Sequence, residues 1–439
     1  MKTTSVLIAI ILFAAISKPV NGQPTAPGPE GPPLSLKQAI QTALEKHPSL
    51  QSAEFAVRGA DARAKQAEAY YYPQVDSSVF QTNGSLRANA VLQPAGTLIE
   101  RNQSDISVGV VARQRIYDFG QTKSRVDAQR SETARFEKDA LTRRAQVVLG
   151  VEQVYMSVLK RKRLVQIAEQ TVRERDVIKQ QVETLYRNQI KSKLDLGLVQ
   201  VQLTDAEFLL IRARNDLAAT YAELNNAMGI EGPPAYSLED LPVVLNDPGD
   251  LPALLSDAMG RRPELLSLKE RMRTAQHRID AATRSNFPVV QALGSAGDTE
   301  HISDRPALRE GGWWGVGAAV SVPLFTGFLI QNQVAEARAQ FREAEAGYLA
   351  LVRDVQLQVT DSFLDLGTLI RQVKVSQDLL AYAREALSLA QQRYRLGLSS
   401  IVEVTQSEIA VTGADTRLAE TQYNAKIAEA RLRYAVGRI

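Results

Sequence analysis

Few side chains in this sequence have the types and spacing that catalysis or metal binding requires. The three histidines, His47, His277 and His301, are widely separated, and no metal-binding His/Glu cluster, nucleophile elbow or phosphate loop is present. Asp354 and Asp361 lie on one predicted helix, where surface charges explain them more simply. Cysteine is absent, which excludes disulfides, thiolate metal sites, a cysteine nucleophile and a lipidated N-terminal cysteine. We therefore expect no enzyme, no cofactor and no metal, and the net charge of +3 does not favour nucleic acid as a partner.

The elements that position the remaining side chains occur twice. Ile116-Tyr117-Asp118 aligns with Leu324-Phe325-Thr326, and at the same offset Tyr186-Arg187 aligns with Tyr394-Arg395. An earlier block around Pro48 also has a counterpart, at a slightly different offset, as expected when one loop has changed length. These matches indicate a tandem internal duplication.

The first residues are typical of a signal peptide. Lys2 supplies the positive charge, an apolar run follows, and cleavage is expected after Ser17 or Gly22. A membrane anchor is the less favoured alternative, because the run is too short to span a bilayer comfortably. Residues 23–33 are rich in proline and predict an extended tether. No later stretch is apolar and long enough for a transmembrane helix, so a membrane location requires β-strands.

Two pairs of segments have the alternation of period two that predicts strands. One face of each strand is apolar, and the other is small or polar. The strands are predicted at 73–84, 105–117, 287–296 and 313–325. Each pair forms a hairpin closed by a long polar loop, near 85–104 and near 297–312.

Long helices follow each strand pair. The stretches 120–187 and 327–395 contain no proline, and in the second Val355, Val359 and Phe363 form an apolar stripe. At 1.5 Å per residue such a helix is about 100 Å long, so it must lie against other helices. Each long helix is followed by a shorter returning helix, and another short helix precedes each strand pair. The combined length of these two short helices is nearly that of the long helix. We expect these two to stack end to end beside it.

The predicted segments are a signal peptide (1–22), a tether (23–33), repeat 1 (34–230), a linker at mid-height (231–250) and repeat 2 (251–439). Repeat 1 contains helices at 34–72, a β-hairpin at 73–118 and a long helical hairpin at 119–229. Repeat 2 contains helices at 251–286, a β-hairpin at 287–326 and a long helical hairpin at 327–437.

Four strands cannot close a barrel, and an open sheet in lipid would leave backbone groups without hydrogen bonds. We therefore expect several chains to share one barrel, and three chains give twelve strands and twelve helical rods. The aromatic residues near the strand ends predict interfacial girdles. The girdle candidates are Tyr72, Tyr117, Phe119, Phe287, Phe325, Trp313 and Trp314.

The ordered set of motifs resembles the TolC-type outer-membrane efflux family. Tyr117-Asp118-Phe119-Gly120 and Leu324-Phe325-Thr326-Gly327 are similar to its strand-to-helix signature, and the segment from Tyr394 to Val404 is similar to its helical-tip signature. The resemblance covers residues 34–439. It implies a homotrimer: a 12-stranded β-barrel in the outer-membrane lipid of a Gram-negative-type bacterium, continued by a 12-helix periplasmic α-barrel. It also implies a periplasmic adaptor and an inner-membrane pump or ABC exporter as partners, and passive export.

The resemblance also implies a gate at the periplasmic tip. Tyr394 matches the gate tyrosine, Asp195 the acid that it bonds, and Glu403 an acidic ring position that favours cations. Ser399 stands where some members have a gate arginine, and Gln406 where they have a second acid, so fewer ionic contacts hold this gate. Simple helix packing and solvated charges are the alternative interpretation. The expected adaptor-docking turns are Asn188, Gln189 and Ile190, and Leu396, Gly397 and Leu398.

Two other classes of protein remain as alternatives. A periplasmic adaptor also has long helical hairpins, but it should have one hairpin flanked by compact β modules. A structural coiled-coil protein does not explain the two β-hairpins. The sequence does not identify the cargo, because one conduit serves drug efflux, metal efflux and protein secretion.

Overall fold

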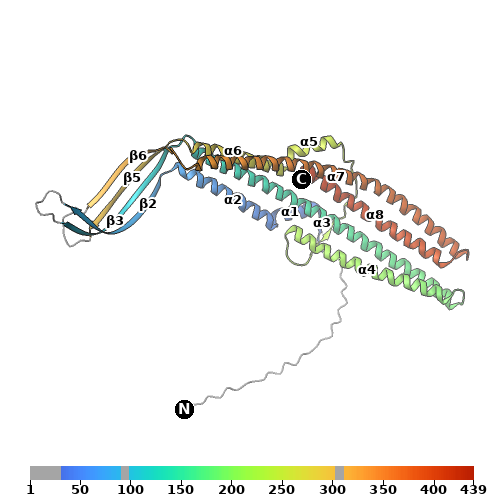
Figure 1. Ribbon diagram of the computed structural model, residues 1–439. Helices are drawn as coiled ribbons and strands as arrows, with labels where there is room; N and C mark the ends of the chain where they lie inside the picture. Colours follow the sequence, from blue (N-terminus) through green and yellow to red (C-terminus); the bar gives the residue numbers. More distant parts are fainter. Residues whose placement is uncertain (1–30, 90–97, 302–310) are drawn as a thin grey trace, which may run out of the picture.

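The computed structural model of the chain describes residues 31–89, 98–301 and 311–439 (Figure 1). The predicted signal peptide, both candidate cleavage sites and residues 23–30 of the predicted tether lie outside these ranges. The elements follow one another as β1 Pro33–Leu34, α1 Leu36–Lys46, α2 Pro48–Glu68, the 3-10 helix η1 Ala69–Tyr71, β2 Gln74–Asn89, β3 Leu98–Tyr117, α3 Gln121–Arg187, α4 Lys193–Met228, β4 Ser237–Leu238, α5 Leu251–Arg261, α6 Pro263–Arg284, β5 Val289–His301, β6 Gly311–Ser321, α7 Leu329–Arg395 and α8 Ile401–Val436.

One end of the molecule is a four-stranded antiparallel sheet in the order β2-β3-β5-β6 (Figure 1). Strands β2, β3 and β5 extend beyond the prediction, because β2 continues to Asn89, β3 begins at Leu98 and β5 continues to His301. The predicted loop at 85–104 is therefore wrong at both ends, and the predicted loop at 297–312 is shortened in the same way. The polar residues there suggested loops, but the hydrogen bonds of an antiparallel ladder join backbone groups and do not depend on side-chain polarity. The predicted strand at 313–325 is wrong at its end, because β6 stops at Ser321, just before Pro323, which has no N–H for the ladder.

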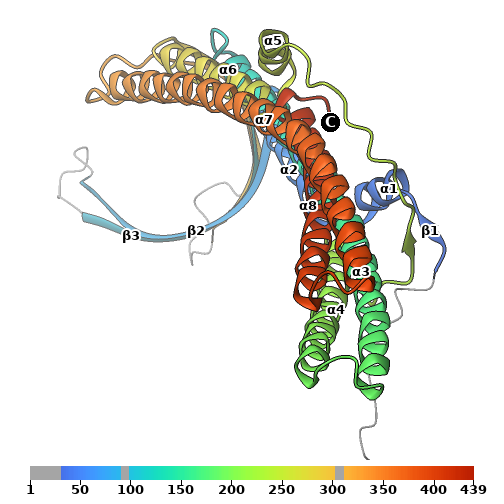
Figure 2. The same cartoon turned by 90° about the vertical axis from the view of Figure 1, so that its right-hand side faces the viewer.

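The register of the ladder gives the curved sheet (Figure 2) two different faces. The face that we call the apolar face is dominated by Val75, Val79, Val108, Val110, Ala112, Val290, Ala292, Ala296, Trp314, Val316, Ala318 and Val320. The face that we call the polar face is mostly small or polar, with Asp76, Ser78, Ser107, Gly109, Arg113, Ser295, Gly297, Thr299, Gly315 and Gly317. On the polar face Arg113 Nη1 lies 3.3 Å from Asp76 Oδ2 across the strand pair.

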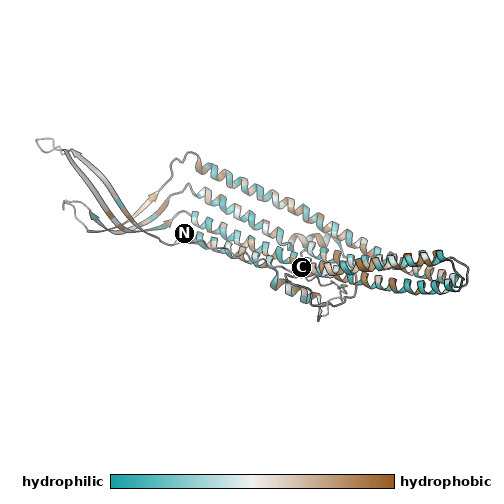
Figure 3. Ribbon diagram, turned by 90° about the horizontal axis from the view of Figure 1, so that it is seen from below, coloured by the Kyte–Doolittle hydropathy of each residue, from teal (hydrophilic) through white to brown (hydrophobic). Residues whose placement is uncertain are grey.

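The helices form a long bundle that continues from the sheet (Figure 1). α3 and α7 occupy the two proline-free runs, as predicted, with 67 residues each, and α4 and α8 have 36 residues each. Beside the sheet the neighbouring helices are α2-α3-α6-α7, and in the far half of the bundle they are α4-α3-α8-α7. Hydropathy alternates along every helix (Figure 3), and no helix in the described ranges contains an apolar stretch long enough to cross a bilayer.

The short and returning helices meet end to end at mid-height, as their lengths predicted. α4 ends at Gly229, whose φ is +69°, and a Cβ built there would lie 2.8 Å from the Cα of His47 between α1 and α2. In the second half, a Cβ at Gly437 would lie 3.1 Å from the carbonyl carbon of Arg261. Close backbone approach of this kind, together with the positive φ, is the reason that glycine stands at both helix ends.

The linker after α4 is attached to the bundle at the same height. Strand β4 in the linker pairs in parallel with β1 next to the N-terminal end of the described chain. The fully buried hydroxyl group of Tyr155 on α3 lies 2.9 Å from the carbonyl oxygen of Leu34 and 3.0 Å from that of Glu239. One side chain of α3 therefore holds both segments against the largest apolar cluster of the helical region.

Candidate functional site

The far end of the bundle consists of the two turns that join α3 to α4 and α7 to α8. Each turn ends its helix with a residue in the left-handed region, Gln189 at φ +58° and Gly397 at φ +75°. The residue after it donates back into the helix, Ile190 N to the Leu185 carbonyl and Leu398 N to the Arg393 carbonyl, each at 2.9 Å. The predicted docking turns therefore have the same backbone shape. Both present exposed apolar side chains, Ile190 on one and Leu396 and Leu398 on the other.

Tyr394 lies in the apolar cluster that joins the two turns. Its ring packs among α3, α4, α7 and α8, and the Nζ of Lys191 lies 4.3 Å from its centroid. Its hydroxyl group is buried and has no hydrogen-bond partner within the described ranges. Burial raises the pKa of this phenol, and the charge of Asp195 adds to the rise. A buried polar group without a partner costs about 1–3 kcal/mol, so a partner outside this chain would stabilise the tip.

Asp195, the expected partner of Tyr394, forms a different set of bonds inside the chain. Its carboxylate accepts from the Ser192 hydroxyl at 2.9 Å and from the Ser192 backbone N at 3.1 Å, and the Ser192 Oγ accepts from Asp195 N at 3.1 Å. This capping box starts α4 and uses the carboxylate locally. The expected hydrogen bond between Asp195 and Tyr394 is therefore not formed within the described chain.

The other predicted gate residues also have defined surroundings. Ser399 has a buried hydroxyl oxygen without a partner among the described residues, as Tyr394 does. Glu403 Oε1 lies 3.5 Å from Arg393 Nε, with both side chains about half exposed, and Gln406 is exposed. The acidic ring predicted at Glu403 is therefore partly balanced by an arginine of the same chain. Solvent screens such an exposed pair, so it contributes little to stability.

Two buried charges above this cluster were not predicted as site residues. Glu408 on α8 follows Ile401 and Val404 at the spacing of the apolar stripe, and Arg175 on α3 is buried near enough to influence its pKa. Arg175 Nη1 donates to the Gln202 carbonyl of α4 at 2.6 Å, so it joins two helices. Burial raises the pKa of Glu408 to about 7, with Arg175 opposing the rise and Glu174 adding to it. The sequence contained one indication of this site, namely that Glu408 stands where the apolar stripe of α8 expects an apolar residue.

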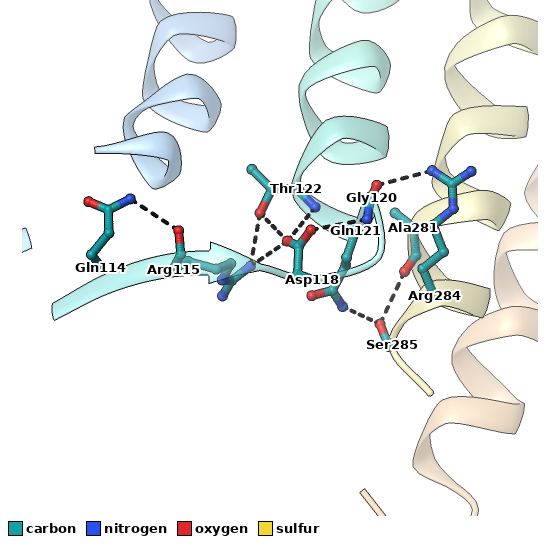
Figure 4. Close-up of polar contacts among 9 residues, drawn as sticks. All are labelled: Gln114, Arg115, Asp118, Gly120, Gln121, Thr122, Ala281, Arg284 and Ser285. Carbon is teal, nitrogen blue, oxygen red and sulfur yellow. Dashed lines mark hydrogen bonds and ion pairs between the residues drawn. The ribbon is translucent and has the colours of Figure 1, made fainter. Parts of the chain in front are cut away.

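The opposite end of the bundle is held to the sheet by a hydrogen-bonded junction (Figure 4). The Asp118 carboxylate accepts from Thr122 N at 2.8 Å and Gly120 N at 3.2 Å, and Arg115 Nη1 lies 3.3 Å from it. Burial raises the pKa of Asp118, but the hydrogen bonds from Thr122 and Arg115 outweigh it, and the net pKa lies below the usual value. Arg284 of α6 donates to the Gly120 carbonyl at 3.0 Å and so ties the neighbouring helix to this turn.

The aromatic residues at the strand ends separate into groups. Phe119 lies 4.8 Å from Tyr117 and stacks on Phe287 at 5.5 Å between ring centroids, beside the junction. The remaining candidates at this end, Tyr72 and Phe325, are exposed. At the other end, the two neighbouring tryptophans point to opposite faces of β6. Trp314 lies on the apolar face and is 79% exposed, whereas Trp313 lies on the polar face and is 39% exposed. A girdle in contact with lipid can contain only one of them.

The outer helices of the far half have apolar faces without a neighbour in the described chain. On α4, Phe208 is 67% exposed although Ala206 two residues earlier is buried, and on α7 Tyr382 is 70% exposed although Leu380 is buried. Two residues turn about 200° around a helix, so each exposed side chain points away from its partner helix. The exposed residues recur every seventh position, at Leu194, Val201 and Phe208 on α4 and at Val375, Tyr382 and Leu389 on α7.

Comparisons with known proteins agree on one family. The family model described as "Outer membrane efflux protein" matches residues 39–230 and 254–438. "Outer membrane protein OprJ" of Pseudomonas aeruginosa is 26% identical over 376 residues, covering 83% of this chain and 76% of that protein. "Outer membrane protein TolC" of Escherichia coli K12 is 22% identical over 426 residues, covering 92% and 82%. A crystal structure of a membrane protein from Pseudomonas aeruginosa has the same fold, with a TM-score of 0.79, 22% identity and 92% and 93% coverage.

Proposed function

The chain belongs to the outer membrane efflux protein family, and we propose that it is the outer-membrane exit duct of a tripartite export system. In this role it is a passive channel that extends from the outer membrane into the periplasm. The observation that carries the proposal is the combination of a sheet with one apolar face and a long helical bundle that continues from it. The partners are then a periplasmic adaptor and an inner-membrane pump or ABC exporter, which supply the energy and select the cargo.

The sheet supports an assembly of three chains around one barrel. Strands β2 and β6 are the two edges of the four-stranded sheet and have no neighbour strand within the described ranges. Unpaired backbone groups in a bilayer cost several kcal/mol each, so the edges must be paired when the apolar face meets lipid. Three chains of four strands each give the 12-stranded barrel expected for this family. Its polar face then lines the channel.

The helices support the same assembly independently. In a ring of three chains, the free edge helix α7 of one chain meets the free edge helix α4 of the next. The two helices run antiparallel, and both carry apolar side chains every seventh residue, which is the spacing of a coiled-coil seam. One antiparallel register places Tyr382 of one chain opposite Phe208 of the next, and the same register places Leu389 opposite Val201. This seam closes the 12-helix barrel below the sheet.

The helical tip is proposed as the gate and the docking site. Tyr394 and Ser399 each bury a hydroxyl group without a partner in the described chain, which supports a role for partners from a neighbouring chain. Asp195 positions the start of α4, and Glu403 with Arg393 sets the charge of the tip, where Gln406 adds no charge. The turns Asn188-Gln189-Ile190 and Leu396-Gly397-Leu398 present matched apolar tips that fit the hairpin of an adaptor.

Fractionation and conductance test this function together. The full-length protein expressed in a Gram-negative host is expected in the outer-membrane fraction, and the purified protein is expected to form ion-conducting channels in planar bilayers. Release by a salt wash, or recovery with the inner membrane, would instead support a periplasmic adaptor. Recovery as filaments without conductance would support a structural coiled-coil protein.

A further inference from the structure

Near the end of the sheet far from the helices, the polar face carries an aromatic group surrounded by very small residues. Gly109, Gly297 and Trp313 lie directly opposite one another across β3, β5 and β6. A Cβ built at Gly297 would lie 2.5 Å from Trp313 Cζ2, and one built at Gly109 would lie 3.0 Å from Trp313 Cη2. The indole ring therefore lies across both glycines, and any larger residue at either position would displace it.

The polar atom of this indole is already satisfied. Trp313 Nε1 donates to the Thr299 hydroxyl at 3.2 Å, and Thr299 Oγ1 lies 3.1 Å from Ser107 Oγ on the next strand. Because the ring edge is fixed by this bond and by the glycines, the exposed remainder of the side chain is aromatic surface. Phe80 on β2 lies on the same face, in the row next to that of Gly109, and is also exposed.

The apolar face at the same height identifies the boundary of the membrane. Beyond Trp314 on that face, β5 carries Asp298 and then Glu300. In the row of Asp298, β3 and β2 still carry Val108 and Val79, so the apolar band ends first at β5 and β6. Carboxylates mark the place where an apolar band ends, and tryptophan is enriched at this boundary. Trp314 therefore suits the outer lipid interface, whereas Trp313 at the same height is on the other side of the wall.

We propose that Trp313, with Phe80, forms an aromatic contact site for planar aromatic cargo inside the outer end of the channel. The proposal rests on the proposed function, because the polar face lines a channel only when three chains close the barrel. The site then occurs three times around one opening. Exposed indole and phenyl rings bind planar rings by stacking and attract cations over their faces, so planar aromatic cations are the favoured class.

Because the chain has only two tryptophans, each can be observed alone by fluorescence. In vesicles, the Trp314→Phe variant reports Trp313 and the Trp313→Phe variant reports Trp314. We expect acrylamide in the aqueous phase to quench Trp313 and brominated phosphatidylcholine to quench Trp314. Quenching of Trp313 by the brominated lipid overturns the proposal. If brominated lipid does not quench Trp314 either, the chain is not inserted, and the proposed function fails instead.

Single-channel block by proflavine, a planar aromatic cation, tests the contact itself. In Trp313→Leu the residence time of proflavine is expected to fall roughly tenfold, the loss typical of one stacking contact, and in Phe80→Leu it should fall less. Trp314→Leu is the matched control on the opposite face, and proflavine should block this variant with the same residence time as in the parent. Open-channel conductance close to that of the parent shows that each variant is assembled. An unchanged residence time in an assembled Trp313→Leu channel overturns the contact site.

Discussion

Replacing Glu408 with glutamine is expected to stabilise the helical tips at alkaline pH and to leave them unchanged in acid. The Glu408 side chain is only 8% exposed and lies among α3, α4 and α8. The charged groups around it are Arg175 and Glu174 on α3, with Asp205 on α4 next to Arg175. Glutamine keeps the shape of the side chain but cannot ionise, so it reproduces the protonated state of the parent at every pH.

The sign of the effect follows from the direction of the pKa shift. Burial raises the pKa of Glu408 from 4.5 to about 7, so between these values the folded chain binds more protons than the unfolded chain. The stability of the parent is therefore highest below the lower value and falls as pH rises through about 7. The full shift corresponds to about 3 kcal/mol per chain. The value of about 7 already includes the opposing charge of Arg175, and relaxation of the protein and solvent around the carboxylate reduces the cost further, so we expect a gain of roughly 1–2 kcal/mol for the variant.

Thermal melting followed by circular dichroism in detergent measures this difference. At about pH 8 the Glu408→Gln variant should melt roughly 2–4 °C above the parent, and at about pH 4 the two should coincide. Glu403→Gln, which removes an exposed carboxylate from the same helix, is the matched control and should leave the melting temperature unchanged. A difference between Glu408→Gln and the parent that stays constant with pH, or a variant that melts lower in alkali, would refute the reasoning.

Three further predictions concern the middle and the tip of the helical region. Gly229→Ala should destabilise the protein by about 2 kcal/mol or more, because the new Cβ would lie 2.8 Å from the backbone of His47. Gly232 also has a positive φ but lies in open space, so Gly232→Ala is the control and should cost only about 1 kcal/mol. Thermal melting measures both effects. Tyr394→Phe should increase the closed-state leak in planar bilayers if the hydroxyl bonds a neighbouring chain, and an unchanged leak removes this residue from the gate. Glu403→Ala should shift the reversal potential in a salt gradient toward anions and Arg393→Ala toward cations, so shifts of the same sign contradict the charge assignment.

The long elements could be predicted because each depends on a local pattern. The absence of proline and the stripe containing Val355 and Val359 determine α7, and the alternation around Val316 determines β6. At the loop ends of both hairpins the strands extend beyond the prediction, because a ladder continues through polar residues as long as its partner strand does. At the other end β6 stops earlier than predicted, before Pro323. The alternation also implies that Trp313 and Trp314 face opposite sides, although both were assigned to one girdle.

The site was less predictable, because a polar side chain there can form hydrogen bonds either with residues of its own turn or with residues of another helix. Asp195 was matched to Tyr394 by resemblance, but Ser192 is three residues away and captures its carboxylate in a capping box. Glu408 and Arg175 are charged residues at positions where the pattern expects apolar ones, and only the packing of three helices shows that they are buried. The edges at β2 and β6 have no partner strand in the described chain, so the proposed closure of the barrel cannot be derived from one chain.

A disulfide across the proposed seam between α7 of one chain and α4 of the next tests the three-chain assembly most directly. The sequence has no cysteine, so a chain carrying both Tyr382→Cys and Phe208→Cys has only these two thiols. Mild oxidation in the membrane should link α7 of each chain to α4 of the next and give a covalent trimer on a non-reducing denaturing gel, whereas each single variant stays monomeric. A double variant that remains monomeric after oxidation, with the parent's conductance intact, would contradict the account.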